Sequence, residues 1–221
     1  MPDQPPPEQP LPIAVLVSGT GTNLQALLQT VHGHEARVVA VASSLAGAPA
    51  LERAVRHNVP TKVFARADYP DRTARDEALA DWLKERGARL VVLAGYMELL
   101  SDSFLQRFGS EESRPDRLGP AVINVHPSLL PAFPGLHAIA QAIEYGVKTI
   151  GVTVHLVDAG VDTGPVILQR AIEMPDTSDP EEVLRALRPV EHALLPEAVR
   201  LIARGAVRLD PEHPRRVLID G

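Results

Sequence analysis

An amide and an imidazole lie two positions apart at the end of an apolar run. The segment Ala121–His137 reads AVINVHPSLLPAFPGLH, with Asn124 and His126 inside it and Pro127 directly after them. Residues two apart in a strand point to one face, and proline cannot donate to a strand ladder, so we expect a strand that ends here. A hydrogen-bond donor beside an acid/base suits a reaction at a carbonyl group. The alternative is that both side chains satisfy backbone groups in a turn.

A carboxylate partner for this pair is available in a later loop. The stretch DAGVDTGP carries Asp158 and Asp162 between two expected strands. A carboxylate beside a histidine stabilises the imidazolium and raises the histidine pKa, and one amide donor to a developing oxyanion contributes about 3 kcal/mol. The candidate catalytic set is therefore Asn124 and His126 with one acid from this loop.

A glycine-rich turn follows the first apolar run. Residues 13–17 (IAVLV) predict a strand, SGTGTN follows, and a helical pattern begins at Leu24. Such a turn leaves backbone N–H groups free at a helix N-terminus, where an anion can bind. Leu24 stands where a dinucleotide fingerprint has its third glycine, and the Gly-Lys-Ser/Thr of a P-loop is missing. The motif therefore suits a small phosphate monoester, and the alternative is a tight turn without a ligand.

Two more stretches lie near the expected ligand edge of the sheet. The run YMELL at 96–100 follows the apolar run at 90–94, and open α/β sheets bind ligands beyond the carboxyl ends of their strands. Arg72 lies in the first turn of an expected helix over 71–86, where its charge opposes the helix dipole. The alternatives are apolar side chains in the core and a solvated surface arginine.

Other catalytic chemistries find little support. Ser128 lies close to His126 in sequence, but no G-x-S-x-G elbow surrounds it. No histidine pair has the helical spacing of a zinc motif with its carboxylate, so we expect no metal. This applies to the four histidines that we considered, His126, His137, His155 and His192. The chain has no cysteine, which excludes disulfides, thiolate metal sites and cysteine nucleophiles.

The elements that must position these residues alternate between strand and helix. This alternation predicts an α/β fold with a doubly wound, mainly parallel sheet, and the strands around Asp158–Asp162 have no helix between them, which predicts antiparallel strands near the C-terminal part. We expect strands at 13–17, 37–42, 61–64, 90–94, 121–125, 149–157 and 166–172. We expect helices from Leu24 and at 49–58, 71–86, 102–108, 136–145 and 180–203, with a final hairpin.

Composition limits the class of protein. The chain has 221 residues, of which 45% are apolar, and we expect a proline-rich disordered arm at 1–10 and a single domain over 11–221. A net charge of −6 argues against nucleic-acid binding, and no apolar run is long enough for a membrane span. The N-terminus is not a secretory signal, and the lack of cysteine fits a cytoplasmic location. The polar stretch 109–120 predicts a flexible surface loop.

Several longer motifs together carry a resemblance to a known family. They are VLVSGTGTNLQALL at 15–28, VVLAGYMELLS at 91–101, INVHPSLLPAFPGLHA at 123–138, GVTVHLVDAGVDTGPVILQ at 151–169 and EHALLP at 191–196. In this order and combination the sequence resembles the folate-dependent phosphoribosylglycinamide (GAR) formyltransferases of purine synthesis. The resemblance implies a Rossmann-like formyltransferase fold. It also implies transfer of the formyl group of 10-formyltetrahydrofolate to the amine of GAR, giving formyl-GAR and tetrahydrofolate.

The resemblance also assigns roles to individual residues. Asn124 would bind the formyl oxygen, His126 would donate the proton, and Asp162 would pair with His126 and raise its pKa. The GAR site would comprise Gly21, Thr22, Asn23 and Glu191, and the folate site would comprise Arg72, Met97, Glu98, Leu99, Leu100 and Asn124. The partners would be these two small molecules, with no metal, nucleic acid or membrane, and the chain would be a monomer or homodimer.

The chain departs from the family at two places. Position 98 is often arginine in the family and is Glu98 here, which puts affinity for the folate tail in question if that side chain matters. The stretch 109–120 resembles an insertion. The related alternatives, methionyl-tRNA formyltransferase and formyltetrahydrofolate hydrolase, normally carry an additional domain for which the chain length leaves no room. A binding module without catalysis is the remaining alternative, and the joint presence of Asn124, His126 and Asp162 argues against it.

Overall fold

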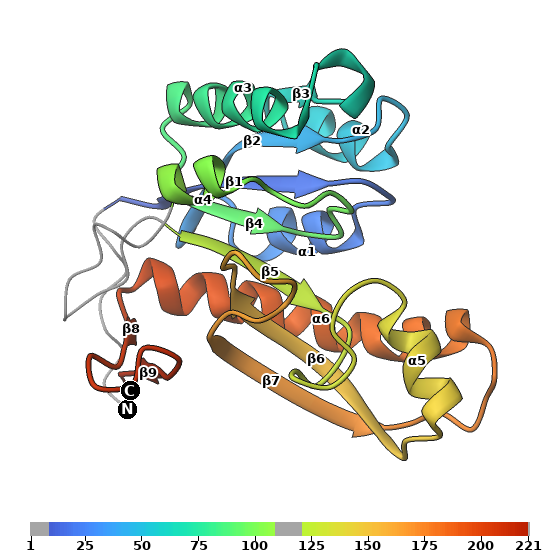
Figure 1. Ribbon diagram of the computed structural model, residues 1–221. Coiled ribbons are helices and arrows are strands. Elements are labelled where there is room, and N and C mark those ends of the chain that lie inside the picture. The colour runs from blue at the N-terminus through green and yellow to red at the C-terminus, as the bar shows by residue number, and fades with distance from the viewer. Residues whose placement is uncertain (1–8, 109–120, 221) are drawn as a thin grey trace.

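The computed structural model describes residues 9–108 and 121–220, and these form a twisted sheet with helices on both faces (Figure 1). The predicted arm at 1–10 falls mainly on residues outside this range, although residues 9 and 10 are described and exposed. The predicted surface loop at 109–120 also lies outside the described residues.

Seven strands form the main sheet in the order β3-β2-β1-β4-β5-β6-β7. The strands β1 to β5 pair in parallel, and the pairs β5–β6 and β6–β7 are antiparallel. The doubly wound, mainly parallel sheet and its antiparallel edge are therefore confirmed. The strands are β1 (Leu11–Val17), β2 (Ala36–Ser43), β3 (Thr61–Val63), β4 (Leu90–Leu93), β5 (Ala121–His126), β6 (Thr149–Leu156) and β7 (Val166–Glu173).

The helices begin and end where local signals place them. Asp71 caps its helix by accepting a 2.8 Å hydrogen bond from the N–H of Ala74, and Asp179 caps the long C-terminal helix through the N–H of Glu181. Gly146 ends another helix in the left-handed conformation. The helices are α1 (Thr22–Thr30), α2 (Pro49–Arg56), α3 (Arg72–Glu85), α4 (Asp102–Phe108), α5 (Ala138–Tyr145) and α6 (Pro180–Ala203), with a 3₁₀ turn η1 at Arg66–Asp68.

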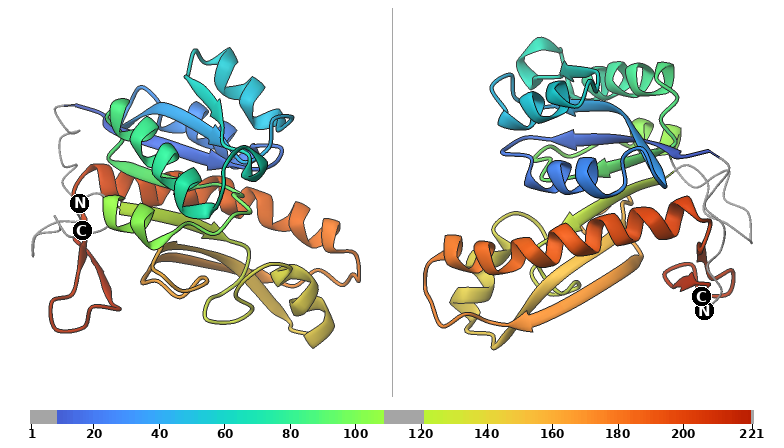
Figure 2. Two further views of the ribbon diagram at one scale, coloured as in Figure 1. Left: turned by 45° about the horizontal axis from the view of Figure 1, so that its top comes forward. Right: turned by 180° about the vertical axis from the view of Figure 1, so that it is seen from behind.

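Alternate strand residues face two different helical layers. In β1, Ile13 and Val15 belong to the core formed with α1, α2, α5 and α6, whereas Ala14 and Leu16 belong to the core formed with α3 and α4. The two views in Figure 2 show α6 crossing behind the sheet, on the face opposite α3 and α4. The continuous apolar runs of the parallel strands follow from burial on both faces.

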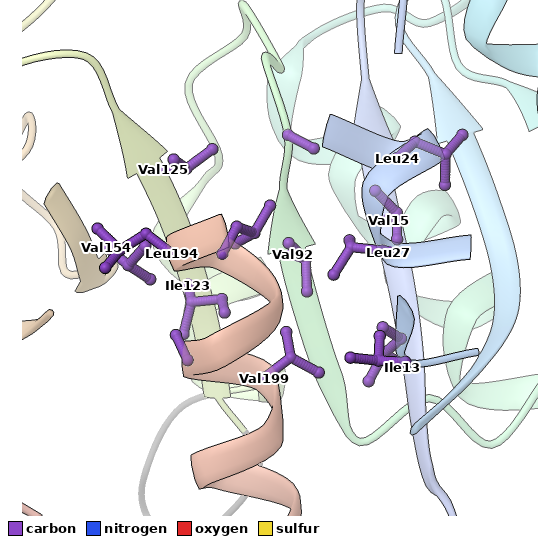
Figure 3. Close-up of a cluster of buried hydrophobic side chains, with 14 of the residues drawn as sticks. Ile13, Val15, Leu24, Leu27, Val92, Ile123, Val125, Val154, Leu194 and Val199 are labelled. Carbon is purple, nitrogen blue, oxygen red and sulfur yellow. The ribbon is translucent and has the colours of Figure 1, made fainter. Parts of the chain in front are cut away.

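In the larger core, side chains of α1 and α6 pack against the same strands of the main sheet. Figure 3 shows Leu27 of α1 and Leu194 and Val199 of α6 directed toward the central strands. These side chains are almost completely buried. Because α1 and α6 pack on the same strands, the loop before α1 and the middle of α6 are held in fixed relation although they are far apart in sequence.

The C-terminal segment forms the predicted hairpin. The strands β8 (Val207–Leu209) and β9 (Val217–Ile219) pair antiparallel beside the main sheet (Figure 1). Arg215 donates a 2.7 Å hydrogen bond to the carbonyl oxygen of Thr163, in the loop between β6 and β7. Among the described residues, no helix has both the length and the apolarity that crossing a membrane requires.

The strand order has a consequence for ligand binding. From β1 the chain winds outward to β2 and β3, and it then returns to β4 on the other side of β1. Loops after β1 and β4 therefore diverge and open a crevice at the carboxyl edge, which is where open α/β sheets bind ligands. The turn at 18–21 and the stretch 94–100 are the two loops at this crevice.

Candidate active site

A cavity of about 700 Å³ opens at the carboxyl edge of the sheet. Its volume lies in the usual range for a site that holds a small molecule. Every residue that the sequence assigned to catalysis or binding lines this cavity, although the residues come from distant parts of the chain. They are Gly21, Thr22, Asn23, Arg72, Met97, Glu98, Leu99, Leu100, Asn124, His126, Asp162 and Glu191.

Asp162 is the centre of the polar cluster. One carboxylate oxygen accepts a 3.1 Å hydrogen bond from the Asn124 amide and lies 3.4 Å from Nε2 of His155. The other lies 3.3 Å from Nδ1 of His126 and accepts a 2.7 Å bond from the N–H of Gly135. Burial alone would raise the pKa of Asp162. The hydrogen bonds from His155 and Gly135 and the charges of the two histidines outweigh burial and lower its pKa from 3.8 to about 2.

Asp158 and Asp162, the two acids of the loop between β6 and β7, make different contacts. Asp158 accepts hydrogen bonds from the N–H of Gly160 at 3.1 Å and the hydroxyl of Thr163 at 2.6 Å, so it shapes the loop. Asp162 has a left-handed backbone with φ of 52°, which is uncommon for a residue other than glycine. The bonds made by Asp158 stabilise a loop whose backbone directs Asp162 toward the strand end. The acid that sequence alone left open is therefore Asp162.

His126 is oriented at both ring nitrogens. Its Nε2 lies 2.9 Å from the carbonyl oxygen of Phe133, and its Nδ1 faces Asp162. A carbonyl and a carboxylate can only accept, so both bonds form together only in the imidazolium form. The ring is almost completely buried. The contacts at both ring nitrogens therefore fix the orientation of the His126 ring in the cavity.

The partners of His155 define its tautomer. Its Nδ1 lies 2.8 Å from the carbonyl oxygen of Leu156, so Nδ1 must carry a proton. Its Nε2 lies 3.3 Å from the Asn124 amide nitrogen and 3.4 Å from Asp162. A neutral His155 accepts from Asn124, whereas a protonated one donates to Asp162. The hydrogen bonding of the Asn124 amide thus depends on the protonation of His155.

The opposite end of the cavity is formed by the turn before α1. Gly21 has φ of 71°, and a Cβ there would lie 2.5 Å from the Cβ of Ala50, so only glycine fits. Asn23 donates a 3.2 Å hydrogen bond to Glu191 of α6. Burial raises the pKa of the Glu191 carboxyl, opposed by Asn23 and by Arg188. Arg188 also lines the cavity, which places a cation at the end where backbone N–H groups of α1 are free.

Apolar side chains from loops form another wall of the cavity. Met97 and Leu99 are 65% and 57% exposed, and both line the cavity together with Leu136 and Val161. These large apolar residues project into the cavity instead of the core, which favours the binding interpretation of the 97–100 stretch. The carboxylate of Glu98 forms a 2.8 Å ion pair with Arg75 behind this wall.

Sequence reasoning did not identify three residues of this region. His155 was considered only as a metal ligand, because alternation with Thr153 indicates its face of the expected strand but not its pairing opposite Asn124. Arg188 lies one helical turn before Glu191, so it shares a helix face with that residue. This spacing points to the cavity only once Glu191 is known to line it. Arg75 looks like a surface residue of an amphipathic helix, and no local pattern reveals its burial. The described residues contain no group of three or more histidine, cysteine, aspartate or glutamate side chains suited to a metal ion.

Comparisons with known proteins agree with this geometry. The formyl transferase family model matches residues 11–199. Phosphoribosylglycinamide formyltransferase from Mycobacterium tuberculosis is 41% identical over 203 residues, which cover 91% of this chain and 89% of that protein. The crystal structure of glycinamide ribonucleotide transformylase 1 from Symbiobacterium toebii superposes with a TM-score of 0.85 at 44% identity, covering 96% of this chain and 95% of that one.

A longer relative matches over one part of its length. The trifunctional purine biosynthetic protein adenosine-3 from Drosophila pseudoobscura is 40% identical over 200 residues, and the match spans 14% of that protein. The matches to the family model and to the Mycobacterium tuberculosis protein extend over most of the chain. The chain therefore belongs to the formyl transferase family and, within it, to the phosphoribosylglycinamide formyltransferases.

Proposed function

We propose that this protein transfers the formyl group of 10-formyltetrahydrofolate to the amine of 5′-phosphoribosylglycinamide, giving formyl-GAR and tetrahydrofolate. The observation that carries this proposal is the cluster of Asn124, His126 and Asp162 in the cavity, between a turn suited to phosphate and an apolar wall. A donor, an acid and an orienting carboxylate at one point are what acyl transfer to an amine requires.

The cavity supplies a place for each substrate. The GAR phosphate would bind the N–H groups at the start of α1, from Gly21 to Asn23, with Arg188 supplying charge. Glu191, turned toward the same end, would accept from GAR. The flat ring system of the folate would lie on Met97–Leu100, with Arg72 near its anionic tail. The two substrates would thus meet at the strand end that carries Asn124.

The chemistry follows from this placement. The amine nitrogen of GAR attacks the formyl carbon, and the electron pair of the C=O bond moves to oxygen. An N–H of Asn124 stabilises this oxyanion. As the electron pair returns to re-form C=O, the bond from the formyl carbon to N10 breaks, and His126 donates a proton to N10. The former amine nitrogen gives up one proton, which restores the proton that His126 has lost. In the structure both Asn124 N–H groups face other acceptors, the Asp162 carboxylate and Nε2 of His155, so one of them must turn to the formyl oxygen during the reaction.

A steady-state assay with GAR and 10-formyltetrahydrofolate tests the proposal. Formyl-GAR and tetrahydrofolate should form in equal amounts, because the formyl group moves between the two substrates. The variants Asn124→Ala and His126→Ala should each lower kcat by about 10²–10⁴-fold. Circular dichroism and thermal melts check that each variant is folded. Formate release without formyl-GAR would instead indicate hydrolysis, and wild-type rates in both variants would sink the assignment of these residues.

Two more predictions from sequence belong to this proposal. A reaction between two small molecules needs neither nucleic acid nor a membrane, and we infer that neither is a partner. A cytoplasmic location and a monomeric or homodimeric state stay predictions. Sedimentation of the purified chain distinguishes the two states.

A further inference from the structure

An arginine without solvent exposure lies behind the apolar wall of the cavity. Arg75, on α3, is 0% exposed and is the largest completely buried side chain among the described residues. It does not line the cavity. A buried guanidinium is costly unless charged and polar partners surround it, so its contacts show what it stabilises.

Arg75 connects α3 to the 97–100 stretch. Its Nε donates a 2.9 Å hydrogen bond to one carboxylate oxygen of Asp76, and its Nη2 forms a 2.8 Å ion pair with the same oxygen. Its Nη1 forms a 2.8 Å ion pair with Glu98, and its Nη2 donates a 3.1 Å hydrogen bond to the carbonyl oxygen of Leu99. One side chain therefore holds both a side chain and a backbone carbonyl of the wall.

Two neighbouring bonds complete the attachment of this wall. The second oxygen of Asp76 accepts a 2.6 Å hydrogen bond from the N–H of Ser101, at the end of the stretch. The hydroxyl of Ser18, after β1, accepts a 2.9 Å bond from the N–H of Met97, at its start. The wall is thus held by polar contacts from behind.

These polar contacts matter because Met97 and Leu99 bury too little apolar surface to fix the conformation of this segment. Met97 and Leu99 are more than half exposed toward the cavity, so they contribute little core packing in the absence of ligand. A segment with few buried apolar contacts opens easily unless other bonds hold it. Arg75 supplies two of these bonds, to the Glu98 carboxylate and to the carbonyl oxygen of Leu99.

We propose that Arg75 is a positioning residue for the folate cosubstrate, and that Glu98 acts as its partner instead of contacting the folate. This inference rests on the proposed function and adds to it Arg75, which lies outside the cavity lining. The pair keeps Met97 and Leu99 in the conformation that binds the ring system. Affinity for the folate should therefore depend on the Arg75–Glu98 pair. Affinity for GAR, which would bind at the other end of the cavity, should not.

A double-mutant cycle tests the pair without relying on one variant. Glu98→Ala removes the exposed partner, whose side chain is 30% exposed, so the fold should tolerate it. We expect the KM for 10-formyltetrahydrofolate to rise on the order of tenfold, with kcat and the KM for GAR within about twofold of wild type. Glu98→Gln keeps an acceptor oxygen for Arg75 and should show a smaller rise. Glu52→Ala, which breaks an exposed Arg–Glu pair on α2, is the matched control.

The second arm of the cycle uses Arg75→Met, or the neutral polar variant Arg75→Gln if the methionine variant does not fold. Adding Glu98→Ala in that background should change the folate KM by less than about twofold, because the partner is already lost. Three results overturn the inference: an unchanged folate KM in Glu98→Ala, the same factor in both backgrounds, or equal rises for folate and GAR. The second would mean that Glu98 touches the folate directly.

Calorimetric titration with tetrahydrofolate separates this inference from the proposed function. If the wild-type protein does not formylate GAR, the proposed function fails. Tetrahydrofolate binding to the wild type and to Glu98→Ala still decides the role of the pair, since its affinity should fall by the same factor as the KM rises. Equal affinities in the two proteins overturn the inference.

Discussion

At the scale of single residues, Arg188 offers the sharpest test of how the cavity is divided. Replacing it with methionine removes a cation from the end of the cavity formed by the α1 turn and Glu191. A lost charged hydrogen bond to the GAR phosphate should raise the KM for GAR about 10–100-fold, with the folate KM unchanged. The measurement is a pair of steady-state titrations, each with the other substrate saturating.

The same helix provides the control for this variant. Arg185, one turn earlier on α6, is exposed and pairs with Glu182 at 3.5 Å, and it does not line the cavity. Arg185→Met removes an equal charge and should leave both KM values at wild-type levels. A similar rise in the GAR KM in both variants would mean that the overall positive charge of α6 matters instead of a contact by Arg188.

At the scale of elements, the junction between β1 and α1 depends on Gly21. Alanine at this position meets two obstacles, since φ is 71° and the new Cβ would lie 2.5 Å from the Cβ of Ala50. Gly87 has the same φ of 71°, but nothing lies within 4 Å of its added Cβ. We expect Gly87→Ala to cost about 1–2 kcal/mol of unfolding free energy from backbone strain alone. Gly21→Ala should cost about 2–4 kcal/mol and should also raise the KM for GAR.

Urea denaturation of the two variants measures this difference. Combining Gly21→Ala with Ala50→Gly removes the 2.5 Å contact but leaves the Cα of residue 50 at 2.8 Å from the new Cβ, so the double variant should regain only a small part of the lost stability. If Gly21→Ala and Gly87→Ala cost the same, the close approach of α2 to the turn is not a constraint. The KM for GAR then tests separately whether the turn holds the phosphate.

The elements also show what sequence can and cannot predict here. Continuous apolar runs and helical patterns predicted the strands and helices closely, because both signals are local. Asn124 and His126 were placed correctly for the same reason, since a period of two and a following proline define a strand end. His155 was not recognised as a partner, because antiparallel pairing of β5 with β6 puts it opposite Asn124 across 31 positions. The burial of Arg75 depends likewise on a loop 23 residues away.

At the scale of the whole molecule, the polar cluster links catalysis to stability. Asp162 is largely buried, and its pKa is lowered from 3.8 to about 2 in the folded protein. A depressed carboxyl pKa stabilises the fold at pH values above 3.8, and this contribution disappears as pH falls toward 2. A difference of nearly two pKa units corresponds to about 2 kcal/mol. The bonds that orient the Asp162 carboxylate therefore also connect β5, β6 and the β6–β7 loop.

This link predicts how the wild-type protein and Asp162→Asn respond to acid. Between pH 4.5 and pH 2 the wild type should lose about 2 kcal/mol more unfolding free energy than the variant, because only the wild type must protonate this carboxyl. Histidines are already protonated in the unfolded chain throughout this window, so they contribute little to the difference. Urea titrations at several pH values measure it. Parallel curves for the two proteins would mean that Asp162 titrates alike in the folded and unfolded states. Its bonds to Gly135 and to the histidines would then orient the carboxylate without stabilising its charge.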